Sequence, residues 1–227
     1  MDKSMCNPDW YKFFLVDPTP GDVIRRMLGR GGLPAEVVAL AGVAQDPVWH
    51  PEGDAFEHTC HVVNAMAQVL SREGIGGDRR VTLLLAALTH DLGKAVSTKW
   101  HPEKQKWVAY GHDVTGVPLA RTALTFLQTC PEKISAILPL VRWHMAHTRK
   151  DFTAKAVAKL SRELFPANIA DLVLLMEADC AGRPPAPPGL PPAVLEQLIP
   201  TALKNRWYTD IPNDSRYLHR RPRPGPV

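Results

Sequence analysis

Cysteine is scarce in this chain, and its spacing excludes a disulfide framework. The 227 residues contain four cysteines, and no two of them form a Cys-x-x-Cys pair. Domains that depend on disulfides are shorter and much denser in cysteine. We therefore expect reduced thiols in a reducing compartment, the cytoplasm.

Long apolar runs are also absent. No stretch of about 18 or more apolar residues occurs, so the sequence predicts no transmembrane helix and no membrane partner. The opening MDKSMCNPDWYKFF lacks a long apolar core behind a basic start, so we expect no secretory leader. With 45% hydrophobic residues, the chain suits one compact domain.

Acidic residues are missing from the C-terminal tail, RYLHRRPRPGPV, which carries four arginines. The formal net charge of +4 equals the charge of those arginines, so the body of the protein is close to neutral and is not expected to bind polyanions over its whole surface. We expect a solvated, disordered tail, and weak nucleic-acid contact through it is the alternative.

Proline separates that tail from the body. The stretch RPPAPPGLPP contains six prolines and predicts a stiff spacer. We predict one domain with its N-terminal helices over residues 1–183, a proline-rich linker over 184–192, and a C-terminal helix with the basic tail over 193–227.

Apolar residues recur at three- and four-residue steps through most of the chain, which predicts an all-α fold. The expected helices cover about 22–28, 34–40, 54–70, 78–93, 113–129, 131–147, 154–164, 167–181 and 193–204. Residues 96–111 are expected to form a loop or hairpin. We expect Asp78 to cap its helix and Pro139 to bend or divide the helix that contains it.

The segment LTHDLGK, residues 88–94, ends an apolar helix with His90 and Asp91. Neighbouring residues on a helix lie about 100° apart, so both cannot join one core stripe. Burying both side chains is costly unless a partner compensates. A metal ion would compensate by binding a nitrogen of one and an oxygen of the other.

A single His-Asp pair proves little, so the metal prediction depends on distant residues. His58 lies on the preceding predicted helix, and Asp179 shares an apolar helix face with Leu172 and Met176. A carboxylate on an apolar face requires a cation or another partner. The alternative is an exposed carboxylate at a helix end.

Several motifs resemble the HD-domain metal-dependent phosphohydrolases, helical bundles with the pattern H…HD…D. They are HT at 58–59, HDLGK at 90–94 and EADCAGR at 177–183. GVAQDPVWHPEGDAFEHTCHVVNAM, YGHDVTGVPLA and VRWHMAHT further resemble the HD domain of bacterial CCA-adding tRNA nucleotidyltransferases. No Gly-Ser turn followed by a paired-aspartate strand occurs, so we expect a stand-alone HD domain without CCA addition.

The resemblance implies a ligand set for one or two divalent transition metal ions. In HD proteins with two metals the order is H…HD…H…H…D, which this sequence supplies as His58, His90, Asp91, His112, His144 and Asp179. Asp91 would bridge the ions, with His58, His90 and Asp179 on one and His112 and His144 on the other. The alternative is that the last two histidines contact phosphate. Imidazole and carboxylate suit Fe, Mn, Co, Ni or Zn.

Three more residues are candidates for substrate contact. Lys94 follows Asp91 by three residues and is also a catalytic candidate for stabilising transition-state charge. Arg183 follows Asp179 by four residues, so both are placed to bind a phosphate. His50, together with Glu52, is expected to shape the pocket rim. For Lys94 the alternative is interaction with the helix dipole. Two metal ions about 3.5–4 Å apart activate water and polarise a phosphoryl oxygen.

The resemblance therefore implies hydrolysis of a phosphoester on a nucleotide or RNA end, such as a 2′,3′-cyclic or 2′-phosphate. Two other functions stay open. One is a mixed-valent di-iron HD oxygenase, which would need iron and O₂ and release no phosphate. The other is a non-catalytic nucleotide- or tRNA-binding module.

Overall fold

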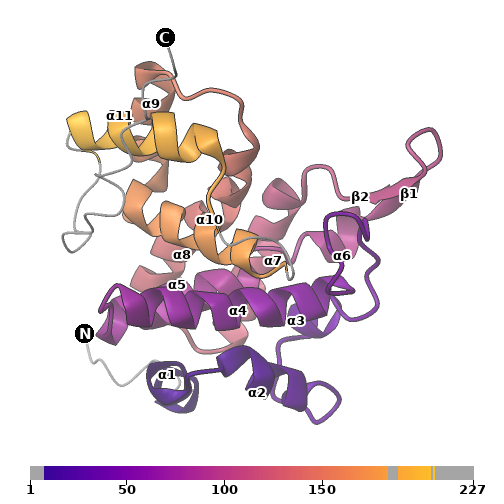
Figure 1. Cartoon of the computed structure of the whole chain (residues 1–227). Coiled ribbons are helices and arrows are strands. Elements are labelled where there is room, and N and C mark those ends of the chain that lie inside the picture. The colour runs from indigo at the N-terminus through magenta and orange to yellow at the C-terminus, as the bar shows by residue number, and fades with distance from the viewer. Residues whose placement is uncertain (1–7, 184–188, 206, 208–227) are drawn as a thin grey trace.

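The computed structural model describes residues 8–183, 189–205 and 207 (Figure 1). Its elements are α1 (Pro8–Val16), α2 (Pro20–Met27), α3 (Ala35–Val38), α4 (Ala55–Arg72), α5 (Gly77–Thr89), α6 (Lys94–Ser97), β1 (Lys99–His101), β2 (Lys106–Val108), α7 (His112–Phe126), α8 (Pro131–Trp143), η2 (His144–Thr148), α9 (Ala154–Leu164), α10 (Ile169–Ala181), η3 (Val194–Leu198) and α11 (Ile199–Lys204). The all-α prediction is confirmed, with one small hairpin added.

Three helices, α4, α5 and α10, form the centre of the bundle, and each is defined by its sequence. Asp54 caps α4 by accepting a hydrogen bond from the Glu57 amide (2.9 Å), and Asn168 caps α10 in the same way. The run from Leu172 to Met176 is fully buried, because α10 is covered on several sides by other helices.

Two glycines bring backbone segments close together near the ends of the central helices. A Cβ at Gly93 would lie 2.0 Å from the His112 carbonyl oxygen, and a Cβ at Gly182 would lie 2.4 Å from Val62 Cγ2. Any larger residue would push these segments apart. Gly93 therefore fixes the turn after Asp91 against the start of α7, and Gly182 fixes the end of α10 against α4.

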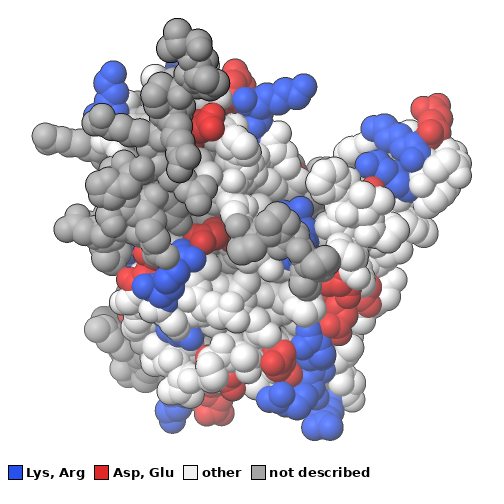
Figure 2. All heavy atoms as spheres, viewed as in Figure 1, with Lys and Arg blue, Asp and Glu red and all other residues white. Residues whose placement is uncertain are grey.

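The β1–β2 hairpin projects from the helical body, at the right of the view in Figure 1. Its strands are antiparallel, with Trp100 opposite Trp107 and Lys99 opposite Val108. Figure 2 shows lysine side chains on this projection, which carries Lys99, Lys104 and Lys106. Of the two structures predicted for residues 96–111, a loop or a hairpin, the hairpin is the one that forms.

The predicted cap at Asp78 was wrong, and of the two effects predicted for Pro139, a bend or a division of its helix, the division does not occur. Gly76 precedes the first turn of α5 as its cap residue, and Asp78 lies within that turn. Pro139 lies inside α8 without ending it. Leu138 and Leu140 on either side of Pro139 are buried, so packing outweighs the hydrogen bond that proline cannot donate. The predicted helix over 131–147 ends at Trp143, and η2 follows.

The last helical segment packs on the body. Leu198 and Ala202 are fully buried, and the Gln197 side chain accepts a hydrogen bond from the Phe152 amide (2.9 Å). Part of the predicted linker, 184–188, and the whole basic tail, 216–227, lie outside the described residues. Within the described ranges, no helix is both long and apolar enough to cross a membrane.

Candidate metal centre

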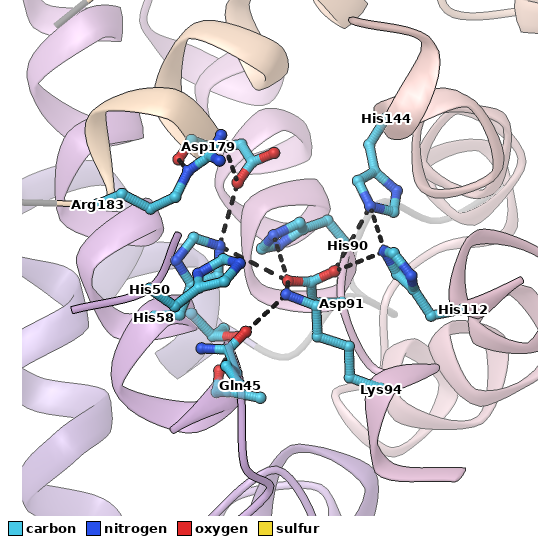
Figure 3. Close-up of polar contacts among 12 residues, drawn as sticks. Gln45, His50, His58, His90, Asp91, Lys94, His112, His144, Asp179 and Arg183 are labelled. Atoms are coloured by element: carbon cyan, nitrogen blue, oxygen red, sulfur yellow. Dashed lines mark hydrogen bonds and ion pairs between the residues drawn. The ribbon is translucent and has the colours of Figure 1, made fainter. Parts of the chain in front are cut away.

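Six buried side chains from separate parts of the chain converge in one cluster (Figure 3). They are His58 on α4, His90 and Asp91 directly after α5, His112 at the start of α7, His144 at the start of η2, and Asp179 in the last turn of α10. None is more than 7% exposed. The structure thus brings together the six residues predicted as metal ligands.

The cluster has two halves. In the first, called the Asp179 half, ligand atoms of His58, His90 and Asp179 lie within 4.8 Å of one another. In the second, called the His112 half, the same holds for His112, His144 and Asp91. Each group has the three nitrogen or oxygen donors that a divalent transition metal site requires.

The Asp91 carboxylate lies between the two halves (Figure 3). Its Oδ2 is 3.2 Å from His90 Nε2 and 3.6 Å from His58 Nε2. Its Oδ1 is 3.1 Å from His112 Nε2 and 3.5 Å from His144 Nε2. One oxygen therefore faces each half, as expected of a carboxylate that bridges two ions.

Backbone carbonyls determine which nitrogen of each imidazole faces the cluster. Nδ1 of three histidines lies 2.7–2.8 Å from a carbonyl oxygen three residues earlier: His90 to Ala87, His112 to Ala109 and His144 to Val141. A carbonyl oxygen only accepts hydrogen bonds, so each Nδ1 is the protonated donor. In the neutral rings, each Nε2 then presents a lone pair to the cluster.

These lone pairs point at other acceptors, and this arrangement fits a bound cation. His112 Nε2 and His144 Nε2 are 3.1 Å apart, although neither is a donor in the neutral ring. His90 Nε2 is buried, faces Asp91 Oδ2 at 3.2 Å and makes no hydrogen bond to any described residue. Buried acceptors that face one another are unfavourable unless a proton or a metal ion lies between them. The donor set in both halves therefore suits divalent metal ions.

A buried carboxylate, Glu52, supports the Asp179 half from behind. Its Oε1 accepts hydrogen bonds from His58 Nδ1 (2.7 Å) and His50 Nδ1 (2.8 Å), and its side chain is 0% exposed. Burial alone would raise the pKa of Glu52, but the hydrogen bonds from His50 and His58 lower it to about 2. Glu52 is therefore an anion that orients both imidazoles.

The carboxylates of the cluster itself are also anionic. Burial opposes ionisation of Asp91, but the charges of a protonated His90 and of Lys94, and hydrogen bonds from His112 and His144 in their protonated forms, hold its pKa well below the usual range. For Asp179, the hydrogen bond with His58 and the charges of His58, Arg183 and His147 likewise hold the pKa well below the usual range despite burial. The centre thus offers negative charge to a cation.

The predicted substrate residues line a cleft of about 900 Å³ that opens onto Asp91 and Asp179. Lys94 Nζ lies 2.7 Å from Asp91 Oδ2 and donates to Gln45 Oε1 at 2.7 Å. Arg183 and His50 also line this cleft. Gln45, which holds Lys94 in place, was not predicted, because nothing in its sequence context distinguishes it.

Two further histidines each follow a cluster histidine by three residues. His147 lines the cleft, donates from Nδ1 to the His144 carbonyl at 2.9 Å, and places Nε2 4.0 Å from Asp179 Oδ2. His61, three residues after His58, is partly buried on α4 and is not among the described residues that line the cleft. His147 is therefore a neighbour of the Asp179 half, and His61 is not.

Comparison with known proteins identifies the family. The HD domain model matches residues 55–179, a range that contains all six cluster residues. A multifunctional CCA protein of Halorhodospira halophila is 35% identical over 178 residues, and one of Alkalilimnicola ehrlichii is 33% identical over 179. Each match covers 74% of this chain and 40% of the relative, so the chain spans about two fifths of those proteins. The resemblance indicated by the motifs is confirmed, and the chain belongs to the HD domain family, whose members are generally metal-dependent hydrolases.

Proposed function

We propose that this protein is a metal-dependent phosphohydrolase that cleaves a phosphoester of a nucleotide or an RNA end. The observation that carries the proposal is the position of Asp91 between the Asp179 half and the His112 half. One carboxylate oxygen of Asp91 faces the histidine nitrogens of each half. Divalent ions held there supply Lewis acidity to water and to a phosphoryl oxygen. Hydrolysis of a phosphoester is the reaction that this chemistry serves best in a cleft lined by cations.

Lys94 and Arg183 are proposed to bind the phosphoryl group. Both line the cleft beside the carboxylates, and their side chains are only 10% and 19% exposed. Lys94 is held by Asp91 and Gln45, so its ammonium group is in position before substrate arrives. Fixed positive charge at this place would neutralise charge that develops on the phosphoryl oxygens.

His50 is proposed to contact substrate as a neutral imidazole. Burial lowers its pKa, and the hydrogen bond to Glu52 only partly opposes this effect. Because its Nδ1 donates to Glu52, its Nε2 is the acceptor. His50 therefore has the protonation state needed to accept a hydrogen bond from a ribose hydroxyl or from water.

The relatives suggest the substrate class. Both are named multifunctional CCA proteins, and the motifs of this chain resemble the HD domain of CCA-adding tRNA nucleotidyltransferases, which suggests an RNA end. This chain matches only 40% of their length, so their complete activity does not transfer to it. We therefore propose only that this centre hydrolyses a phosphoester of a nucleotide or an RNA end.

A panel of phosphoesters would test the proposal. Protein purified without a metal-affinity tag is incubated with 2′,3′-cyclic nucleotides, 2′-nucleotides and 3′-nucleotides in the presence of Mn²⁺, Co²⁺, Ni²⁺ or Mg²⁺. We expect turnover that Asp91→Ala and Asp179→Ala each abolish. Glu163→Ala serves as a matched control, because this α9 carboxylate is 40% exposed and pairs with Lys159 on the same helix at 3.7 Å.

Two results would contradict the proposal. Iron- and O₂-dependent oxidation without phosphate release would favour a di-iron oxygenase. Tight nucleotide binding without turnover, under every metal condition, would favour a non-catalytic binding module.

A further inference from the structure

Three exposed aromatic side chains border the same cleft as the metal centre. Trp49 is 62% exposed, Tyr110 is 59% exposed and Trp107 is 38% exposed, and all three line the cleft. Single exposed aromatics are common, but a cluster at a polar cleft marks a binding surface. The metal centre itself uses none of these rings.

The two segments that carry the aromatics are held together. Lys106 of β2 lies 3.3 Å from Asp46 Oδ2, and Asp46 Oδ1 accepts a hydrogen bond from the Val48 amide at 3.0 Å. The Asp46 carbonyl also accepts from the His50 amide at 2.9 Å. The turn that presents Trp49 is therefore fixed against the hairpin that presents Trp107.

The rings on the hairpin side are braced by their neighbours. Trp107 packs edge-to-face on Trp100 across the strands, with ring centroids 5.6 Å apart. Lys104 Nζ lies 5.2 Å from the centre of the Tyr110 ring and donates to its hydroxyl at 2.6 Å. Bracing reduces the conformational entropy that these side chains would lose on binding a ligand.

The cleft is lined by two chemically different sets of residues. Asp91, Lys94 and Arg183 suit a phosphoryl group, whereas Trp49, Trp107 and Tyr110 present aromatic rings. The cleft volume of about 900 Å³ is near the upper end of the range for small-molecule sites, and far exceeds what a phosphate group alone needs. A ligand that uses both sets of residues carries a phosphate and a flat ring system.

We propose that Trp49, Trp107 and Tyr110 form a base-stacking subsite, which accepts the nucleobase of a nucleotide whose phosphoester lies beside Lys94 and Arg183. This inference rests on the proposed function and specifies its substrate as one recognised through its base. Stacking on aromatic rings tolerates any base, so the subsite selects nucleotides over base-free phosphoesters and prefers no particular base strongly.

Calorimetric titration of metal-loaded protein with AMP and with ribose 5-phosphate tests the subsite. We expect wild type to bind AMP more tightly, and Trp49→Ala and Trp107→Ala each to reduce the ratio of the two affinities by roughly 5- to 100-fold. Phe126→Ala is the matched control, because Phe126 is 55% exposed at the far end of α7 and is not among the described cleft residues. Circular dichroism verifies that each variant is folded.

The outcomes separate this inference from the proposed function. Equal affinity of wild type for AMP and ribose 5-phosphate, or an unchanged ratio in both tryptophan variants, overturns the stacking subsite even if phosphoesters are hydrolysed. A ratio that falls in both variants supports the subsite even if no phosphoester in the panel is turned over.

Discussion

The two halves of the metal centre differ in what lies behind their imidazoles. In the Asp179 half, His58 donates its Nδ1 proton to the buried carboxylate of Glu52. In the His112 half, both histidines donate to neutral backbone carbonyls. A carboxylate behind a ligating imidazole makes that imidazole a stronger base and a better ligand than a carbonyl does.

The distribution of charge points the same way. The Asp179 half has its own carboxylate, Asp179, in addition to Glu52. Among the described residues, the His112 half has no carboxylate other than Asp91, which it shares with the other half. We therefore expect the Asp179 half to bind its ion more tightly, and the following predictions test this difference.

The largest effect is expected for Asp91→Ala, because Asp91 faces both halves. We expect loss of both ions and a fall in turnover of about 10³-fold or more, since the nucleophile and the phosphoryl oxygen both lose their Lewis acid. Metal content by elemental analysis and phosphate release measure the two effects. Retention of two ions by the variant would contradict the bridging role.

Single-half variants should separate the two ions. His112→Ala is expected to retain one tightly bound ion, whereas Asp179→Ala is expected to retain only a weakly bound one. Calorimetric titration of the metal-free variants with Mn²⁺ or Co²⁺ gives both affinities. Equal affinity of the remaining ion in the two variants would show that the halves do not differ.

Glu52→Gln should weaken the Asp179 half selectively. Glutamine has nearly the same shape but no negative charge, so His58 loses the ionic part of its support. We expect the affinity for the tighter ion to fall by about 10–100-fold, with a smaller change for the weaker ion.

Glu57→Gln is the matched control for that substitution. Glu57 lies on α4, one residue before His58, and its carboxylate pairs with Arg25 at 2.8 Å rather than with a cluster residue. If both variants bind metal alike, Glu52 does not support the site.

The smallest effect is expected for Gly93→Ala, which acts on the His112 half through packing. The added methyl group would overlap the His112 carbonyl oxygen. We therefore expect the free energy of unfolding to fall by about 1–3 kcal/mol and the affinity for the weaker ion to fall as well. Urea unfolding measures the first effect. Gly189→Ala is the control, because a Cβ there meets no atom of the described residues within 4 Å and should change stability by less than about 0.5 kcal/mol.

The helices could be predicted from the periodicity of the sequence alone, whereas the cluster residues could not. The apolar steps of α4 and α10 predicted both helices closely, because each buries a continuous face. The six cluster residues followed from the family motif, because spacing along the chain does not show that Asp179 lies beside His58. Their roles as metal ligands remain predictions.

The supporting contacts lay beyond sequence reasoning. Glu52 was regarded only as part of the pocket rim, and its bridge between His50 and His58 depends on how a loop folds back on α4. Gln45 contacts Lys94 across 49 positions of the chain. The sequence did not show that α8 continues through Pro139, because the packing of its buried neighbours cannot be weighed against a lost hydrogen bond without the tertiary structure.

Anomalous diffraction from crystals grown with Mn²⁺ would test the central claim most directly. We predict two peaks on opposite sides of the Asp91 carboxylate, one among His58, His90 and Asp179 and the other beside His112 and His144, with the higher occupancy in the Asp179 half at limiting metal. The absence of any peak between these side chains, with His58 and Asp179 turned away from His90, would contradict it.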